Sequence, residues 1–272
     1  MKITTALLVF VLFFSCASSR ETNYTASTPA SVTVRNFLGL ALTDSIDFIR
    51  WKLSINDKQY SLDCSYGIGK PNTNGFFDGG KNVAFTGPLV KEKNIYTFRH
   101  GNRILKFAEL NPNLLHILNE DNTLMIGTGG WSYAINNLMP LHNDQLTLKA
   151  KQPVLKDSMA FQGRTPCGVP GVPKSGQCYK LKWYLVLYGS TQNNQPLTYR
   201  LLGTGYRLEG GRKGKWKVNT ESGKITYELL DESGKPFLHL LKLDEGVLIF
   251  TDEKGNLLVG DHDFSYTLNR KF

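Results

Sequence analysis

The chain repeats itself, and this internal duplication constrains its fold more than any other feature. Shifting the 272-residue sequence by 133 positions places residues 103–137 on residues 236–270 without a gap, and nine of the 35 pairs are identical. The identical pairs include Leu124/Leu257, Gly127/Gly260, Ser132/Ser265, Tyr133/Tyr266 and Asn136/Asn269. Self-similarity at a fixed offset indicates two copies of one structural unit.

Upstream of this block the match continues with small gaps, and the matching markers keep their order. The aligned markers are Phe37-x-Gly39 with Phe161-x-Gly163, Trp51-x-Leu53 with Trp183-x-Leu185, Tyr60-x-Leu62 with Tyr199-x-Leu201, and Tyr96 with Tyr227. We therefore predict two related domains, over residues 35–137 and 161–272. A connection over residues 138–160, with a short strand at residues 146–148, is expected to join them.

Each copy has the pattern of antiparallel β-structure. Residues 131–135 and 264–268 alternate large with small side chains, which puts Trp131, Tyr133 and Ile135 on one face of a strand. Polar turn segments such as residues 119–122 and 252–256 recur about every 8–12 residues. No segment shows a convincing helical stripe. The sequence therefore predicts an all-β chain with two tandem, related, antiparallel small β-barrels.

The N-terminal segment has the three-part pattern of a secretory signal peptide. One Lys precedes an apolar run over residues 6–14, and small residues follow. That run is far shorter than the ~20 residues that a membrane-spanning helix needs. Residues 13–16, Phe-Phe-Ser-Cys, resemble a bacterial lipobox, which implies removal of residues 1–15 and acylation of Cys16. The alternative is ordinary cleavage near residues 17–19, which would discard Cys16.

Residues 16–34 are rich in Ser, Thr and Ala without periodicity, and they predict a flexible tether between the membrane and the folded body. A lipid anchor on Cys16 places the protein at the bacterial cell envelope, and we expect the outer membrane. The formal net charge of +9 comes from 32 basic and 23 acidic residues without a Lys/Arg block. This distribution argues against a nucleic-acid partner and fits an anionic membrane surface.

Cys167 and Cys178 lie in one segment rich in Gly and Pro near the start of the second copy. We expect a structural disulfide, which would stabilise the domain by roughly 2–3 kcal/mol in the chain-entropy model. A two-Cys metal site is the alternative, although no His or third Cys lies nearby in the sequence. Cys64 aligns with Gly203 and alternates with polar residues, which indicates a buried, inert thiol.

Three motifs of the second copy resemble the NlpE-like bacterial lipoproteins, which are linked to copper resistance and envelope stress. They are Gly163-x-x-Pro166-Cys167, Gly214-x-Trp216 and Phe264-x-Tyr266-x-Leu268. The resemblance covers residues 161–272, and residues 37–137 share it as a degenerate copy. It implies a lipocalin-like barrel in each copy. The family typically has Cys-x-x-Cys after the Pro, whereas ten residues separate Cys167 from Cys178 here.

The search for an active site finds no recognised catalytic motif, and the five His residues are scattered. Asp261-His262-Asp263 is the one dense polar cluster, and its place in a predicted turn favours a solvated loop. A divalent-metal or acid–base role is the alternative. We therefore expect no enzymatic activity, no metal and no cofactor.

Three functions compete. The resemblance implies a membrane-anchored, non-enzymatic envelope lipoprotein that senses or binds another envelope protein. The second is a lipocalin-like carrier of a small apolar ligand held in a barrel lumen. The third is a hydrolase that uses His262. The aromatic residues expected in a ligand-binding lumen, which core packing explains more simply, are Trp51, Trp131, Trp183 and Trp216.

Overall fold

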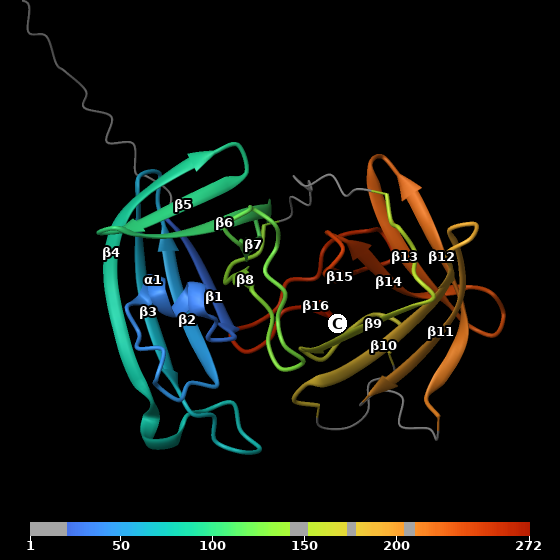
Figure 1. The fold of residues 1–272 in the computed structure, drawn as a ribbon, viewed down its shortest axis with the longest axis horizontal. Helices are drawn as coiled ribbons and strands as arrows, with labels where there is room; N and C mark the ends of the chain where they lie inside the picture. Colours follow the sequence, from blue (N-terminus) through green and yellow to red (C-terminus); the bar gives the residue numbers. More distant parts are fainter. Residues whose placement is uncertain (1–20, 142–151, 173–177, 204–209) are drawn as a thin grey trace, which may run out of the picture.

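The computed structural model describes residues 21–141, 152–172, 178–203 and 210–272. These residues form two closed antiparallel barrels of eight strands each, which lie side by side (Figure 1). In each barrel every strand pairs with the next strand along the chain, and the last strand pairs with the first. The predicted all-β chain with two tandem, related barrels is confirmed.

The strands of the two barrels follow the same order. Barrel 1 contains β1 (Thr22–Thr28), β2 (Phe48–Ile55), β3 (Gln59–Gly67), β4 (Lys81–Glu92), β5 (Ile95–His100), β6 (Arg103–Asn111), β7 (Leu114–Ile117) and β8 (Ala134–Asn137). Barrel 2 contains β9 (Ser158–Thr165), β10 (Leu181–Ser190), β11 (Gln195–Gly203), β12 (Arg212–Glu221), β13 (Lys224–Leu230), β14 (Pro236–Lys242), β15 (Val247–Thr251) and β16 (Thr267–Lys271).

The predicted tether over residues 16–34 is wrong from residue 22 onward, because residues 22–28 form β1 and a helix begins at Val32. Strand β1 pairs with both β2 and β8 and so closes barrel 1. Tyr24 and Ala26 are buried inside, while Thr25 and Ser27 are buried on the other face. Because the second face carries hydroxyl side chains, the sequence does not show the apolar residues by which a buried strand is recognised. Without β1, the edges of β2 and β8 would stay unpaired.

Strand register corrects where the first copy begins. Ala26 pairs with Trp51 in the same way that Gly163 pairs with Trp183. β1 is therefore the counterpart of β9, and Phe37, which the repeat alignment places there, belongs to a helix instead. Barrel 1 begins with β1 rather than at residue 35, and barrel 2 begins with β9 rather than at residue 161. The predicted strand at residues 146–148 lies outside the described residues.

The two first strands also end in the same hydrogen bond. The indole N–H of Trp51 donates to Thr28 Oγ1, and that of Trp183 donates to Thr165 Oγ1, both at 2.8 Å. This shared detail supports the structural equivalence of the two barrels.

A helix follows β1 in barrel 1. α1 (Val32–Leu38) begins after Ser31, whose side chain accepts a hydrogen bond from the Val34 N–H. It ends at Gly39, which adopts the left-handed conformation that favours glycine. The apolar face of α1, formed by Val34, Phe37 and Leu38, is buried in the core of barrel 1. A 3₁₀ turn, η1 (Phe77–Gly79), precedes β4.

Side chains pack against one another inside both barrels. In barrel 1 the rings of Tyr60 and Phe98 stack with their centroids 4.3 Å apart. In barrel 2 the centroids of Trp183 and Phe250 are 4.7 Å apart. Each lumen is therefore a hydrophobic core along these strands.

Candidate functional site

The two barrels pack on each other through a third apolar cluster, and the interface has pseudo-two-fold symmetry. Its paired members, each 133 residues apart, are Ala108/Leu241, Leu110/Leu243, Leu114/Val247 and Leu124/Leu257. The hydroxyl oxygens of Ser132 and Ser265, at the same offset, share a hydrogen bond of 2.5 Å. Each barrel therefore uses the same surface, as two subunits of a symmetric dimer do.

Two equivalent asparagines cross this interface in opposite directions. The Gly260 N–H donates to Asn136 Oδ1 at 3.0 Å, and Asn136 Nδ2 donates to the Asp261 carbonyl at 3.0 Å. In the other direction, the Gly127 N–H donates to Asn269 Oδ1 at 2.7 Å. These bonds explain why Asn136/Asn269 and Gly127/Gly260 are identical in the two copies. The barrels are thus joined by a specific, buried interface.

A cleft of about 720 Å³ opens where the two barrels meet. Barrel 1 contributes the start of β2, the β3–β4 loop over residues 69–74, and Trp131. Barrel 2 contributes Arg164 near the end of β9 and residues 179, 180 and 182 around the start of β10. Its size is typical of ligand sites, and we take this inter-barrel cleft as the candidate functional site.

Aromatic rings contact two of the cations of the cleft. Trp131 stacks on Phe48 with the ring centroids 4.6 Å apart. Arg164 lies over the Trp131 ring, with its guanidinium carbon 5.6 Å from the centroid. Lys180 lies over Phe264, with its Nζ 5.3 Å from the centroid. Cation–π contacts orient these charges without neutralising them.

Positive charge dominates the lining of the cleft. Lys70, Arg164, Lys180 and Lys182 contribute four basic side chains, against the single carboxylate of Asp47. Burial lowers the pKa of Lys180, and repulsion from Arg164 and Lys182 lowers it further. A negative charge placed among these groups would oppose both effects.

In the polar cluster Asp261-His262-Asp263, the first two residues are exposed, as the expected solvated turn predicts, whereas Asp263 takes part in the interface. The Asp263 carboxylate accepts hydrogen bonds from the Arg50 guanidinium at 2.6 Å and from the Asn74 amide at 2.7 Å. The Asp261 carboxylate accepts backbone N–H bonds within its own turn. Across the described part of the chain, His, Cys, Asp and Glu side chains form no group suited to hold a metal ion. His262 Nε2 lies 3.3 Å from Asp263 Oδ2, and the hydrolase alternative stays a prediction.

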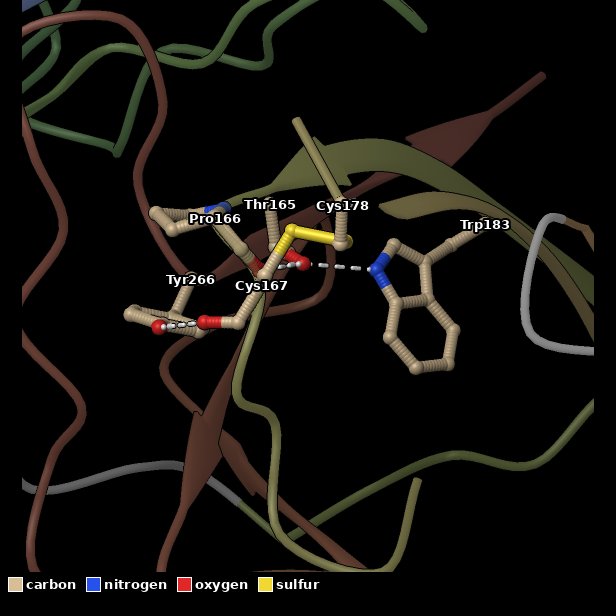
Figure 2. Close-up of a disulfide and its surroundings, with 6 residues drawn as sticks. All are labelled: Thr165, Pro166, Cys167, Cys178, Trp183 and Tyr266. Atoms are coloured by element: carbon tan, nitrogen blue, oxygen red, sulfur yellow. Dashed lines mark hydrogen bonds between the residues drawn. A yellow bond between two sulfur atoms is a disulfide. The ribbon is translucent and has the colours of Figure 1, made fainter. Parts of the chain in front are cut away.

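The predicted disulfide between Cys167 and Cys178 is confirmed (Figure 2). Tyr266 donates a hydrogen bond to the Cys167 carbonyl at 2.8 Å, and Trp183 donates to nearby Thr165, so both aromatic residues fasten the start of the bridged loop to barrel 2 (Figure 2). Because both sulfur atoms are bonded to each other, the alternative of a two-Cys metal site is not supported.

The prediction that Cys64 is a buried, free thiol is confirmed as well. Burial raises the pKa of the Cys64 thiol well above its ordinary value, so the reactive thiolate is disfavoured. Cys64 pairs with Trp51 as Gly203 pairs with Trp183, which is the alignment that the sequence predicts.

The four tryptophans do not share one environment. Trp51, Trp183 and Trp216 are buried in the barrel cores, as the packing explanation predicts. Trp131 precedes β8 and lies at the cleft, so the expected strand face shared by Trp131, Tyr133 and Ile135 is wrong. Tyr133 and Ile135 point into barrel 1 without it. The buried rings contact other core side chains, and the apolar-ligand carrier stays a prediction.

Sequence reasoning did not single out Arg164 or Lys180. Lys180 and Lys182 alternate at the start of a strongly β-prone segment, which is a visible signal of a basic strand face. No local signal brings Arg164 to Trp131, because the packing of two barrels creates that contact.

No family model, curated protein or solved structure matches this chain. Within the described residues, every helix is too short or too polar to cross a bilayer. Cys16 lies outside those residues, so its acylation stays a prediction.

Proposed function

We propose that this protein is a lipid-anchored, non-enzymatic binding protein of the bacterial cell envelope. The anchor is an acylated Cys16, the location is the outer membrane, and the role is NlpE-like sensing or binding of another envelope component. The observation that carries the proposal is the inter-barrel cleft, because it combines a ligand-sized volume with charges held in place by aromatic rings. The signal peptide and lipobox of the sequence support the location.

The interface supports a binding role because it fixes the two walls of the cleft relative to each other. Hydrogen bonds in both directions and a shared apolar cluster join the barrels. The free-energy cost of ordering the two walls is therefore small when a ligand that contacts both of them binds. A pair of domains on a flexible linker would lack this advantage.

The short distance from the anchor to the fold supports a defined orientation. β1 begins at Thr22, six residues after Cys16, and six extended residues span at most ~20 Å. Thr22 pairs with Ile55 at one end of β2, whereas the cleft includes Phe48 at the other end. An anchor at Cys16 thus holds one end of barrel 1 near the bilayer, with the cleft at the opposite end of the β1–β2 ladder.

Metabolic labelling tests the anchor. Cells of a Gram-negative bacterium expressing the full chain are grown with an alkyne analogue of palmitate, and the purified protein is analysed for label. We expect label on the wild type and on the Cys64→Ser control, and none on Cys16→Ser. An unlabelled wild type, or a Cys16→Ser variant that keeps the label, would contradict the proposal.

Membrane fractionation tests the location. In a sucrose density gradient the wild type is expected with the outer-membrane fractions. Recovery with the inner membrane, or in the soluble periplasmic fraction, would rule out an outer-membrane anchor.

A further inference from the structure

Two cations of the cleft are held by aromatic rings and not by ion pairs. In the described part of the chain, neither Arg164 nor Lys180 forms an ion pair, and each lies over an aromatic ring instead. Arg50, which lies nearby, differs because Asp263 neutralises it at 2.6 Å. The cleft therefore has two positioned cations whose charge remains available.

The pseudo-two-fold symmetry shows that the interface does not need these charges. By strand register, Arg164 is the counterpart of Ser27, and Lys180 is the counterpart of Phe48. At the related position Ser27 crosses the interface through a neutral hydrogen bond, from its hydroxyl to the His262 carbonyl at 2.9 Å. Ser27 and Phe48 are uncharged, and the cation on that side, Arg50, is paired with Asp263. The packing of the barrels therefore does not explain unpaired charges at Arg164 and Lys180.

We propose that the inter-barrel cleft binds a soluble multivalent anion, a ligand that carries two or more phosphate or carboxylate groups. This inference deepens the proposed binding function by naming the ligand chemistry. Arg164 offers the planar fork that suits a phosphate or carboxylate, and Lys180 and Lys70 add point charges. The ring of Tyr179, which is 83% exposed, offers an apolar surface beside them.

The electrostatics of the cleft favour such a ligand. Lys180 loses hydration in the cleft and is repelled by Arg164 and Lys182, and these effects outweigh the attraction of Asp263, so the pKa of Lys180 is lowered. A bound anion would supply an opposite charge to Arg164 and Lys180 and offset the repulsion between the basic side chains. Binding is therefore expected to weaken with added salt, because part of the attraction is screened.

The orientation of the cleft favours a soluble source over a membrane headgroup. The cleft lies at the Phe48 end of β2, opposite the end where Ile55 pairs with Thr22 near the proposed anchor. Headgroups of the bilayer that holds Cys16 would have to reach past the length of the β1–β2 ladder. We therefore assign the ligand to the solution side.

Titration with sodium tripolyphosphate tests the inference. The full-length protein is reconstituted into phosphatidylcholine nanodiscs in about 150 mM NaCl, and binding is measured by calorimetry and tryptophan fluorescence. Trp131 is the fluorescent reporter at the cleft, since Trp51, Trp183 and Trp216 are buried. We expect saturable binding that weakens at least tenfold in the double variant Arg164→Gln/Lys180→Gln.

A matched control removes the same charge elsewhere. The control variant is Lys213→Gln/Lys215→Gln. These two lysines line a separate basic groove on barrel 2, together with Arg200 and Tyr188. This variant is expected to keep the affinity within twofold of the wild type. No saturable binding by a wild type with a normal circular dichroism spectrum, or equal losses in both double variants, would overturn the proposal.

Nanodiscs of a second composition distinguish the source of the anion. With phosphatidylglycerol mixed into the bilayer, the affinity for tripolyphosphate is expected to stay within twofold. A tenfold weakening that depends on Arg164 and Lys180 would mean that lipid headgroups occupy the cleft, which overturns the soluble source. Because Cys16 labelling is measured separately, failure of the anion site and failure of the anchor can be told apart.

Discussion

The two barrels share a strand order and a first-strand hydrogen bond, yet the segment that follows the first strand differs. In barrel 1, α1 inserts Val34, Phe37 and Leu38 into the core. In barrel 2 the same position holds the loop bridged by Cys167 and Cys178, whose Val169 enters the core. One barrel thus stabilises this segment by helical packing and the other by a covalent bond.

This difference shows which parts of the fold the duplication preserves. The ladder of strands and the interface surface are common to both copies, because every strand needs two neighbours and each barrel needs the other. The segment after the first strand only has to cover core side chains. Any structure that buries an apolar residue there is sufficient, so the two copies have diverged.

The largest expected effect comes from removing Phe37, the apolar anchor of α1, and the matching change in barrel 2 is at Val169. Phe37→Ala should lower the free energy of unfolding by about 3–5 kcal/mol, because Phe37 is fully buried against Tyr60 and Phe85. Val169→Ala should cost only about 1–2 kcal/mol, because methyl groups rather than a phenyl ring are lost and the disulfide still holds the loop. Urea unfolding followed by circular dichroism measures both.

The control for this comparison is Leu42→Ala, which truncates an exposed side chain just after α1 and should change little. Equal losses for Phe37→Ala and Val169→Ala would contradict the idea that α1 depends on packing more than the bridged loop does.

A second difference between the copies lies in their shared interface, where His116 of barrel 1 matches Ile249 of barrel 2. Burial lowers the pKa of His116 from 6.5 to about 4, and its Nε2 has no hydrogen-bond partner within the described residues. Between these pH values the unfolded chain binds a proton that the folded chain excludes. Stability should therefore fall by about 3 kcal/mol from pH 7 to pH 4 through this group.

His116→Ile copies the residue of barrel 2 and isolates this contribution from those of the carboxylates. Unfolding in urea at pH 7, 5.5 and 4 should show a smaller loss of stability in the variant than in the wild type. Identical pH dependence of the two proteins would show that His116 is not excluded from protonation in the fold.

Opening the disulfide is expected to have a smaller effect than removing Phe37. Cys167→Ser/Cys178→Ser should lower the free energy of unfolding by about 2–3 kcal/mol, because the unfolded chain regains the freedom of the closed loop. Dithiothreitol should reproduce this loss in the wild type and leave the double variant unchanged. A double variant as stable as the wild type would assign the stability of this segment to packing alone.

Much of the fold could be predicted because the repeat aligns residues with local signals. Trp51 and Trp183 mark equivalent strands, and the pair Cys64/Gly203 follows from them. The disulfide was predictable because its two cysteines share one turn-rich segment. β1 was missed because its second face carries buried hydroxyl residues: Thr25 donates to the Trp51 carbonyl, and Ser27 donates to the His262 carbonyl of the other barrel.

The sequence by itself determined the duplication, the barrel class and the bridged loop, since each depends on residues close in the chain or on a fixed offset between copies. Only the tertiary structure decided where β1 lies and how the cleft is built. Phe48, Trp131, Arg164 and Lys180 come from four separate segments of both barrels. They meet because a buried, pseudo-symmetric interface fixes the barrels, and no local pattern encodes the contacts that such packing creates.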